Sequence, residues 1–400
     1  MPWKEVFPME ERLRFAIIAG KGTEVFCDLC KEYGISTKTG YKWLHRYEQL
    51  GAAGMRELSR RPHQSPNRTK AALEELVVRM RRKRPKYGPK KLYELLAREH
   101  GPQGLPAVST IAKIISKRGL AGKRGRRPRK GQIVRLDRPA LTQASRPNEV
   151  WAVDFKGWFK TGDGSRCDPL TVTDLHSRFV ICVKAVPAPT QRVVRRAFSG
   201  VFRKYGLPEA IRVDNGPPFA SLGLAGLSKL SVWWTRLGIR VEFIRPASPQ
   251  MNGSHERMHR TLKAEATQPA SDNLQAQQRR FDRWRQRFNH ERPHEAIRMR
   301  RPADLYQASP RRHNGHDKMI RYPEDYIVRP VSSSGYLRYG GANYFVGEAF
   351  ADTLIGLYKN STHETELYFA NKLLGKLETQ VQARFRPTAS IGPAPEPISA

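Results

Sequence analysis

The segment 117–146 limits the possible folds of this chain more than any other. Eleven of its thirty residues are Lys or Arg, Asp137 is its single acid, and few of the others are apolar. Such a run cannot contribute to a hydrophobic core, and its like charges favour an extended chain. We therefore predict a basic linker over 121–146 that separates folded domains and lies along a phosphate backbone. A solvated tether without defined contacts is the alternative.

The distribution of charge predicts a polyanionic partner. The chain has 72 Lys+Arg and 37 Asp+Glu, a net charge of +35, and residues 1–147 carry 34 basic against 13 acidic side chains. The net charge falls to +12 over 148–310 and to +2 over 311–400. Nucleic acid is the first candidate partner. We expect no membrane span and no secretory signal, and four cysteines indicate a reducing compartment rather than a disulfide framework.

The apolar periodicity of residues 1–60 predicts a helix-turn-helix domain. Helices are expected over 10–19, 24–33 and 37–50, with Ser36 as the N-cap of the third and Tyr41 pointing into the core. The polar residues that begin the third helix would enter a major groove, and they are Lys38, Thr39 and Lys42. A plain helical hairpin is the alternative.

Residues 61–120 repeat this pattern and predict a second, winged helix-turn-helix domain. Helices are expected over 69–84, 90–100 and 110–118, the last capped by Ser109. Two such units in tandem predict an extended DNA site. The DNA contacts predicted here and in the linker are Lys90, Lys91, Arg124, Arg126 and Arg127. Cys27 and Cys30 are interpreted as small buried hydrophobes rather than as metal ligands.

Residues 147–310 alternate strand and helix patterns, which predicts an α/β domain with a mixed sheet. Asp154 and Asp214 each end a strand, and Glu256 lies in the first turn of a helix. Three carboxylates that converge repel one another unless a cation lies among them. Mg²⁺ prefers oxygen ligands, and two such ions roughly 4 Å apart can activate a nucleophile and stabilise the leaving oxygen of a phosphodiester.

The ordered set of motifs in this region resembles the DDE transposases of bacterial insertion sequences, whose core is an RNase H-like fold of the retroviral-integrase type. The motifs are Trp151–Asp154, Val213–Gly216 with Phe219, Ser248–Arg257, Asn289–His294 and Arg301-Pro302. The resemblance covers roughly residues 5–310. The acids are 60 and 42 residues apart, and an insertion within 221–231 would explain why the second interval is a little longer than is usual in the family.

The resemblance implies a function and a role for each matching residue. Asp154, Asp214 and Glu256 are expected to hold two Mg²⁺ ions per site, with Mn²⁺ able to replace them. Arg260 and Lys263, on the same helix as Glu256, are expected to contact the DNA of the element's ends. The protein would bind terminal inverted repeats, free 3′-OH ends and join them to target DNA. It would work as a dimer or tetramer in the bacterial cytoplasm, associated with the nucleoid.

Other acids and histidines of this region, and the function of the chain itself, allow alternative interpretations. Asp174 is interpreted as a hairpin-turn residue and Asp163 and Asp168 as solvated loop residues, whereas His255 and His259 are not needed as ligands for Mg²⁺. His294 is expected to order a loop. A non-catalytic DNA-binding regulator that kept the fold is the alternative function, and a nuclease of the same core is a second rival.

Short β-rich runs between 318 and 382 predict a small all-β domain, expected to be a barrel. The runs begin at Tyr326, Tyr336, Asn343, Thr353, Glu364 and Lys372. Residues 383–400 are rich in Pro, Ala and Ser and are predicted to be a disordered tail. The whole chain is thus predicted to be multidomain, with an all-α N-terminal region, an α/β RNase H-like integrase core and a small all-β C-terminal domain.

Overall fold

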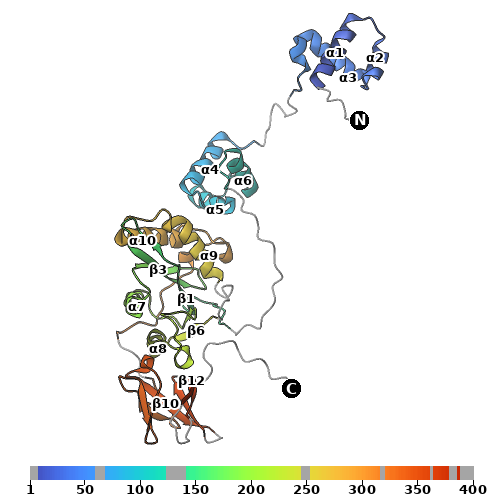
Figure 1. The fold of residues 1–400 in the computed structure, drawn as a ribbon. Helices are drawn as coiled ribbons and strands as arrows, with labels where there is room; N and C mark the ends of the chain where they lie inside the picture. The colour runs from blue at the N-terminus through green and yellow to red at the C-terminus, as the bar shows by residue number, and fades with distance from the viewer. Residues whose placement is uncertain are drawn as a thin grey trace, which may run out of the picture. The chain divides into compact units, whose positions relative to one another are not determined.

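The computed structural model describes residues 8–58, 68–122, 141–244, 253–315, 320–360, 364–377 and 385–387. The chain divides into two compact units, residues 1–70 and 71–400. Figure 1 shows the helices and strands of both units. The predicted DNA contacts Arg124, Arg126 and Arg127 lie outside the described residues, as does the predicted tail except for residues 385–387.

The first unit contains three helices, α1 (Pro8–Lys21), α2 (Phe26–Glu32) and α3 (Thr37–Leu50), and the 3-10 helix η1 (Gly51–Met55). The Ser36 hydroxyl accepts a hydrogen bond from the Thr39 amide, which confirms the predicted cap. The inward position of Tyr41 was wrong, since its side chain is 60% exposed. Gly40 and Trp43 face the core instead, and a Cβ on Gly40 would meet Cys30 Sγ at 2.6 Å, so α3 can approach α2 this closely only without a side chain there.

The second unit begins with a three-helix domain, α4 (Ala71–Lys83), α5 (Pro89–His100) and α6 (Val108–Lys117). Leu92, Leu96 and Ile111 are fully buried at its centre. The helix α6 begins after Ala107, so Ser109 lies inside the helix and is not its cap, contrary to the prediction. A wing would need strands, and residues 68–122 contain none. Among the cysteines, Cys30 is buried as predicted but Cys27 is exposed.

A mixed sheet forms the centre of the second unit, with strand order β4-β3-β1-β5-β6 and the short β2 paired to the start of β3. The strands are β1 (Val150–Phe155), β2 (Phe159–Lys160), β3 (Arg166–Asp174), β4 (Val180–Val186), β5 (Ala210–Val213) and β6 (Arg240–Phe243). β1 is antiparallel to β3 and parallel to β5, and β5 is parallel to β6. This is the mixed α/β sheet that the alternating pattern predicted.

Helices cover both faces of the sheet. α7 (Gln191–Tyr205) and α8 (Lys229–Arg236) pack on one face, where Trp151, Phe198 and Trp234 are fully buried. α9 (Gly253–Leu262), the π-helical turn Lys263–Thr267 and α10 (Leu274–His290) cover the other, where Leu262 and Trp284 pack against Val180. Burial of these large apolar side chains holds the sheet as a rigid support for its carboxyl-terminal edge.

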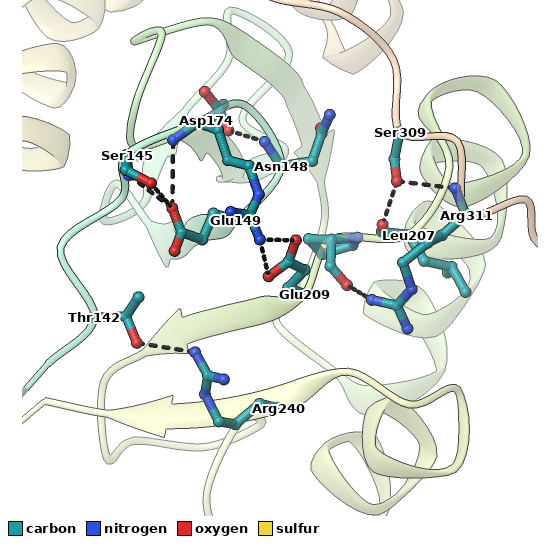
Figure 2. A network of polar contacts seen from close by, with 12 residues as sticks. Thr142, Ser145, Asn148, Glu149, Asp174, Leu207, Glu209, Arg240, Ser309 and Arg311 are labelled. Atoms are coloured by element: carbon teal, nitrogen blue, oxygen red, sulfur yellow. Dashed lines mark hydrogen bonds and ion pairs between the residues drawn. The ribbon is translucent and has the colours of Figure 1, made fainter.

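A polar network ties the segment before β1 to its neighbours (Figure 2). The Asn148 amide donates to Asp174 Oδ1 at 2.7 Å. The Ser177 amide donates to Asp174 Oδ2 at 2.7 Å. Arg146 forms an ion pair with Glu209 at 3.0 Å. Asp174 is fully buried and organises the β3–β4 turn, as predicted. Asp168, by contrast, is not solvated: it is 4% exposed and paired with Arg166 at 2.6 Å.

The C-terminal part of the second unit is all β. A five-stranded sheet has the order β13-β12-β11-β10-β7, with β7 (Ile327–Pro330), β10 (Leu354–Lys359), β11 (Thr365–Phe369), β12 (Lys372–Leu377) and β13 (Phe385–Pro387). A hairpin of β8 (Tyr336–Tyr339) and β9 (Ala342–Phe345) accompanies it. The strand positions agree with the prediction to within one or two residues, while closure into a barrel stays a prediction. Among the described residues, every helix is too short or too polar to span a lipid bilayer.

Candidate active site

Asp154 is placed by β1 at the edge of the sheet where the parallel strands end. Its side chain is 31% exposed, and the Phe155 amide donates a hydrogen bond to Oδ1 at 2.7 Å. Burial and, after it, the negative charges of Asp214 and Glu256 raise the pKa of Asp154 to about 7. Asp214 and Glu256 are therefore close enough to act on Asp154.

Asp214 follows β5 directly. The parallel register pairs Val150 with Ala210 and Ala152 with Arg212, and continuing it by two residues puts Asp214 beside Asp154. The Gly216 amide donates to Asp214 Oδ1, and a Cβ at Gly216 would lie 3.2 Å from Asp214 Oδ2. Burial raises the pKa of the Asp214 carboxyl. Asn215 donates to the Ile244 carbonyl at 2.6 Å, which links this turn to the end of β6.

Glu256 lies in the first turn of α9, and its side chain is exposed. Arg260 and Lys263 follow at one and two helical turns, and both are exposed as well. His255, Met258 and Leu262, in contrast, are buried against the sheet. The helix thus presents an acid and two cations to solvent along one side, as the spacing predicted. The residues that precede α9, 245–252, lie outside the described part of the chain.

Two histidines of α9 form a buried network with β3 that the sequence did not reveal. His255 and His259 both contact Thr171 Oγ1, at 2.8 and 2.7 Å through Nε2, and His255 Nδ1 lies 2.6 Å from Thr173 Oγ1. The Thr171 hydroxyl donates to the Asp154 carbonyl at 2.9 Å. Its lone pairs are then left to accept from both Nε2–H groups. Burial lowers the pKa of His255 to about 3 and of His259 to about 2, so both rings are neutral.

The bare Nδ1 of His259 consequently faces a carboxylate. It lies 3.7 Å from Asp154 Oδ2, and both atoms offer lone pairs when Asp154 is ionised. Either a proton on Asp154 or a cation between the two atoms relieves this contact. Among the described residues, one group of three potential metal ligands lies within 4.8 Å, and it consists of Asp154, His255 and His259. Asp154 and the bare Nδ1 of His259 could therefore hold a divalent cation, whereas both ring nitrogens of His255 already contact threonine hydroxyls. Joint ligation by all three acids stays a prediction.

The other predicted contact residues have separate positions. Lys38 is exposed at the start of α3, the Thr39 hydroxyl contacts Ser36 at 2.9 Å, and Lys42 Nζ lies 4.6 Å from the centre of the Trp43 ring. Lys90 is exposed on α5, whereas Lys91 is half-buried and turned toward the catalytic domain. Their contacts with DNA stay predictions.

Comparison with known proteins identifies the central domain. Residues 144–249 and 237–302 match two family models, each described as "Integrase core domain". The central domain belongs to the integrase core family. Residues 39–115 match a third family model, described as "Homeodomain-like domain". The matches thus agree with the two kinds of domain that the sequence predicted, an integrase core and a helix-turn-helix region before it.

The relatives of the integrase core include proteins of bacterial insertion elements. The "Insertion element IS407 uncharacterized 31.7 kDa protein" of Burkholderia multivorans is 28% identical over 242 residues, which are 60% of this chain and 82% of that protein. The "Insertion element IS476 uncharacterized 39.2 kDa protein" of Xanthomonas euvesicatoria is 26% identical over 57% of this chain. The chain spans only 63% of this second relative.

Among solved structures, the HTLV-2 integrase catalytic core domain in complex with magnesium is 18% identical, with a TM-score of 0.34. The match covers 41% of this chain and all of that one.

Proposed function

We propose that the chain is the transposase of a bacterial insertion element, which cuts DNA at the ends of its element and joins the freed 3′-OH groups to target DNA. The observation that carries the proposal is the position of Asp154 and Asp214 at the ends of the neighbouring parallel strands β1 and β5, with His259 Nδ1 3.7 Å from Asp154 Oδ2. Burial and the nearby charges of Asp214 and Glu256, which raise the pKa of Asp154, support it. A carboxyl crowded in this way at a partly open site is typical of a catalytic metal centre. The integrase core family supplies the class of reaction.

In this proposal Asp154, Asp214 and Glu256 hold two Mg²⁺ ions, and Mn²⁺ can replace them. Bound divalent cations supply Lewis-acid activation of the attacking oxygen and charge stabilisation at the leaving oxygen. The chain itself fixes the carboxylates: the amides of Phe155 and Gly216 orient Asp154 and Asp214. His255 and His259 exclude water from the inner side of the site, and His259 aims a lone pair at Asp154 Oδ2. Arg260 and Lys263 bind the phosphates of the DNA end.

The remaining parts of the proposed protein bring DNA to this site. The two helical domains read the terminal repeats, with Lys38, Thr39 and Lys42 at the start of α3 and Lys90 at the start of α5 as contacts. Two ends must be joined in one event, so the active form is a dimer or a tetramer. We infer that this activity belongs to the bacterial cytoplasm, at the nucleoid, and the insertion-element relatives support this inference.

The test is a strand-transfer assay with a duplex that carries the inverted repeat flanking the coding region. The unchanged protein should nick and join this duplex only with Mg²⁺ or Mn²⁺, whereas Asp154→Asn should bind it equally well and give no product. Asp325→Asn, an exposed aspartate in the turn before β7, is the matched control and should be fully active.

Each rival function predicts a different outcome. A non-catalytic regulator would bind the duplex but release no metal-dependent product, and a nuclease would cut duplexes without preference for the repeat. Strand transfer retained by Asp154→Asn would overturn the assignment of the site.

A further inference from the structure

A second concavity lies on the opposite side of α9 from Glu256. It is a cavity of about 450 Å³ in the second unit. Ser254, Arg257 and Thr261 line it from α9, where a spacing of three and four residues places them on one face of the helix. Arg178 contributes from the β3–β4 turn, Arg292 from the segment after α10, and Lys91 from α5. Residues of two of the sequence motifs, Ser248–Arg257 and Asn289–His294, therefore meet here.

The lining is cationic, and most of its charge is not neutralised. Lys91, Arg178, Arg257 and Arg292 surround the cavity, and only Arg292 forms an ion pair within the described residues, with Glu265 at 2.7 Å. The buried acid Asp174 also lines the cavity, but its oxygens already accept hydrogen bonds from the amides of Asn148 and Ser177. Glu295 is exposed at the rim. Among the described residues, Lys91, Arg178 and Arg257 thus form no ion pair, although the charge of Asp174 acts on Arg178 and that of Glu295 acts on Lys91.

Burial and mutual repulsion act on these cations. Burial lowers the pKa of Arg178, and the charge of Arg257 lowers it further. Burial and the charge of Arg292 bring the pKa of Lys91 to about 8. Arg178 Nε is buried and has no hydrogen-bond partner among the described residues. An anion in the cavity would relieve the repulsion and accept from this donor, because a guanidinium presents its N–H groups to phosphate oxygens.

One layer of side chains separates this cavity from the acid site. Thr173 lines the cavity and contacts His255 Nδ1 at 2.6 Å. The His255 ring meets the His259 ring edge-on, with centroids 4.5 Å apart, and His259 faces Asp154. A polymer that contacted both the cavity and the acid side of α9 would therefore be held close to the catalytic carboxylates.

We propose that this cavity binds a phosphate group of the DNA strand that is delivered to the active site, through Arg178, Arg257 and Lys91. The inference rests on the proposed function and deepens it. A DNA phosphate is favoured over a free anion because Lys91 belongs to the helical domain and the two arginines to the catalytic domain. Tyr87 of the same helical domain packs under Arg292, whose guanidinium lies 4.8 Å from the ring centre. An occupant that bridges these domains is expected to be an extended polyanion.

The experiment measures binding of the inverted-repeat duplex by fluorescence anisotropy in the absence of metal. Arg178→Gln and Arg257→Gln should each weaken binding by roughly five- to tenfold near 100 mM salt and reduce the salt dependence by about one phosphate contact. The matched control is Arg192→Gln, an exposed residue of α7 that does not line the cavity, and it should lose far less affinity.

A phosphate scan tests the contact itself. Duplexes in which single phosphates are replaced by neutral methylphosphonates should show one position at which the unchanged protein loses affinity and Arg178→Gln does not. Ser254→Asp, which adds a carboxylate to the cavity in the first turn of a helix where an acid is tolerated, should weaken binding without removing a side chain that the fold uses. Melting curves identify any variant that is misfolded.

The outcomes separate this inference from the proposed function. If the unchanged protein does not bind the repeat, the proposed function fails. If it binds the repeat but all cavity variants keep its affinity, salt dependence and phosphate pattern, the cavity assignment alone is overturned. Calorimetry with tripolyphosphate provides the second arm: binding that is lost in Arg178→Gln, with no loss of DNA affinity, would mean that a free anion and not DNA occupies the cavity.

Discussion

Charged groups of opposite sign lie close together on the two sides of α9, carboxylates on one side and guanidinium groups on the other. On one side the charges of Asp214 and Glu256 raise the pKa of Asp154, and burial raises the pKa of both Asp154 and Asp214. On the other side burial and the charge of Arg257 lower the pKa of Arg178. In the two proposals made above, α9 has a metal site on one side and a phosphate site on the other, so one helix holds both the metal and the DNA backbone.

The largest effect expected from this comparison follows loss of an acid. Glu256→Gln should lower strand transfer at least ~10³-fold while end binding changes less than about twofold, since an amide cannot replace a carboxylate at a divalent cation. Arg257→Gln, the next residue, should do the reverse and weaken binding more than turnover at saturating DNA. Single-turnover assays at saturating DNA separate the two. Equal losses of turnover in both variants would mean that the two sides of the helix do not have distinct roles.

Because the pKa of Asp154 is raised in the folded protein, the stability of the protein should fall as the pH rises. The native Asp154 retains its proton up to a pKa of about 7, whereas the unfolded chain releases it near the ordinary value of 3.8. Folding therefore loses stability as the pH rises from about 4 to 7, by up to roughly 4 kcal/mol for a shift of three pKa units. Asp154→Asn removes this cost and should melt higher than the unchanged protein at pH 8 in EDTA, with a much smaller gain at pH 5.

Metal provides the control for that measurement. Mg²⁺ should raise the melting temperature of the unchanged protein at pH 8 and have little effect on Asp154→Asn, because binding to the native state alone stabilises it. If the melting temperatures of the two proteins differ by the same amount at pH 5 and at pH 8, the pKa of Asp154 is not raised.

His259 should matter less than the acids but more than a surface residue. His259→Ala should reduce strand transfer roughly 10- to 100-fold, the range usual for residues that orient a metal ligand. The Mg²⁺ concentration that gives half-maximal activity should rise in the same variant, because the lone pair aimed at Asp154 Oδ2 is lost. His290→Ala, at the end of α10, is the matched control. A loss of activity with unchanged metal dependence would assign His259 a purely structural role.

The smallest effect is expected at the contact between the helical and catalytic domains. Arg84 pairs with Glu291, whose side chain is 43% exposed. Surface ion pairs of this kind contribute about 0–1 kcal/mol, so Glu291→Ala should hardly change the melting temperature. Arg292, which contacts both Glu265 and the Tyr87 ring and is 8% exposed, should be more costly to remove. Denaturant titrations of both variants would rank the two contacts, and a greater loss at Glu291 would contradict this reading.

The sequence predicted those features that follow from periodicity and from local turns. Strand alternation placed Asp154 and Asp214 at neighbouring strand ends, and helical spacing put Arg260 and Lys263 beside Glu256. The Thr171–His255–His259 network could not be found in this way, because it joins a strand to a helix 84 and 88 residues away. Its only signal was the i, i+4 spacing of two histidines on the buried side of the acid helix, next to a strand rich in threonine.

The errors have physical causes of the same kind. Tyr41 was assigned to the core by its apolar ring, but Gly40 and Trp43 take the inner face of α3 because the helices approach closely at the glycine. Asp168 was assigned to solvent from the glycines before it, whereas β3 begins at Arg166 and carries the residue into the interior. In both cases tertiary packing, which a single sequence pattern does not contain, decided the outcome.

The segment 225–232 also supports the C-terminal domain. Ala225, Leu227 and Val232 share one apolar cluster with Leu337, Phe350 and Phe369 of that domain. Removal of the residues after 315 would expose this apolar surface, so the shortened protein should aggregate rather than form a minimal enzyme.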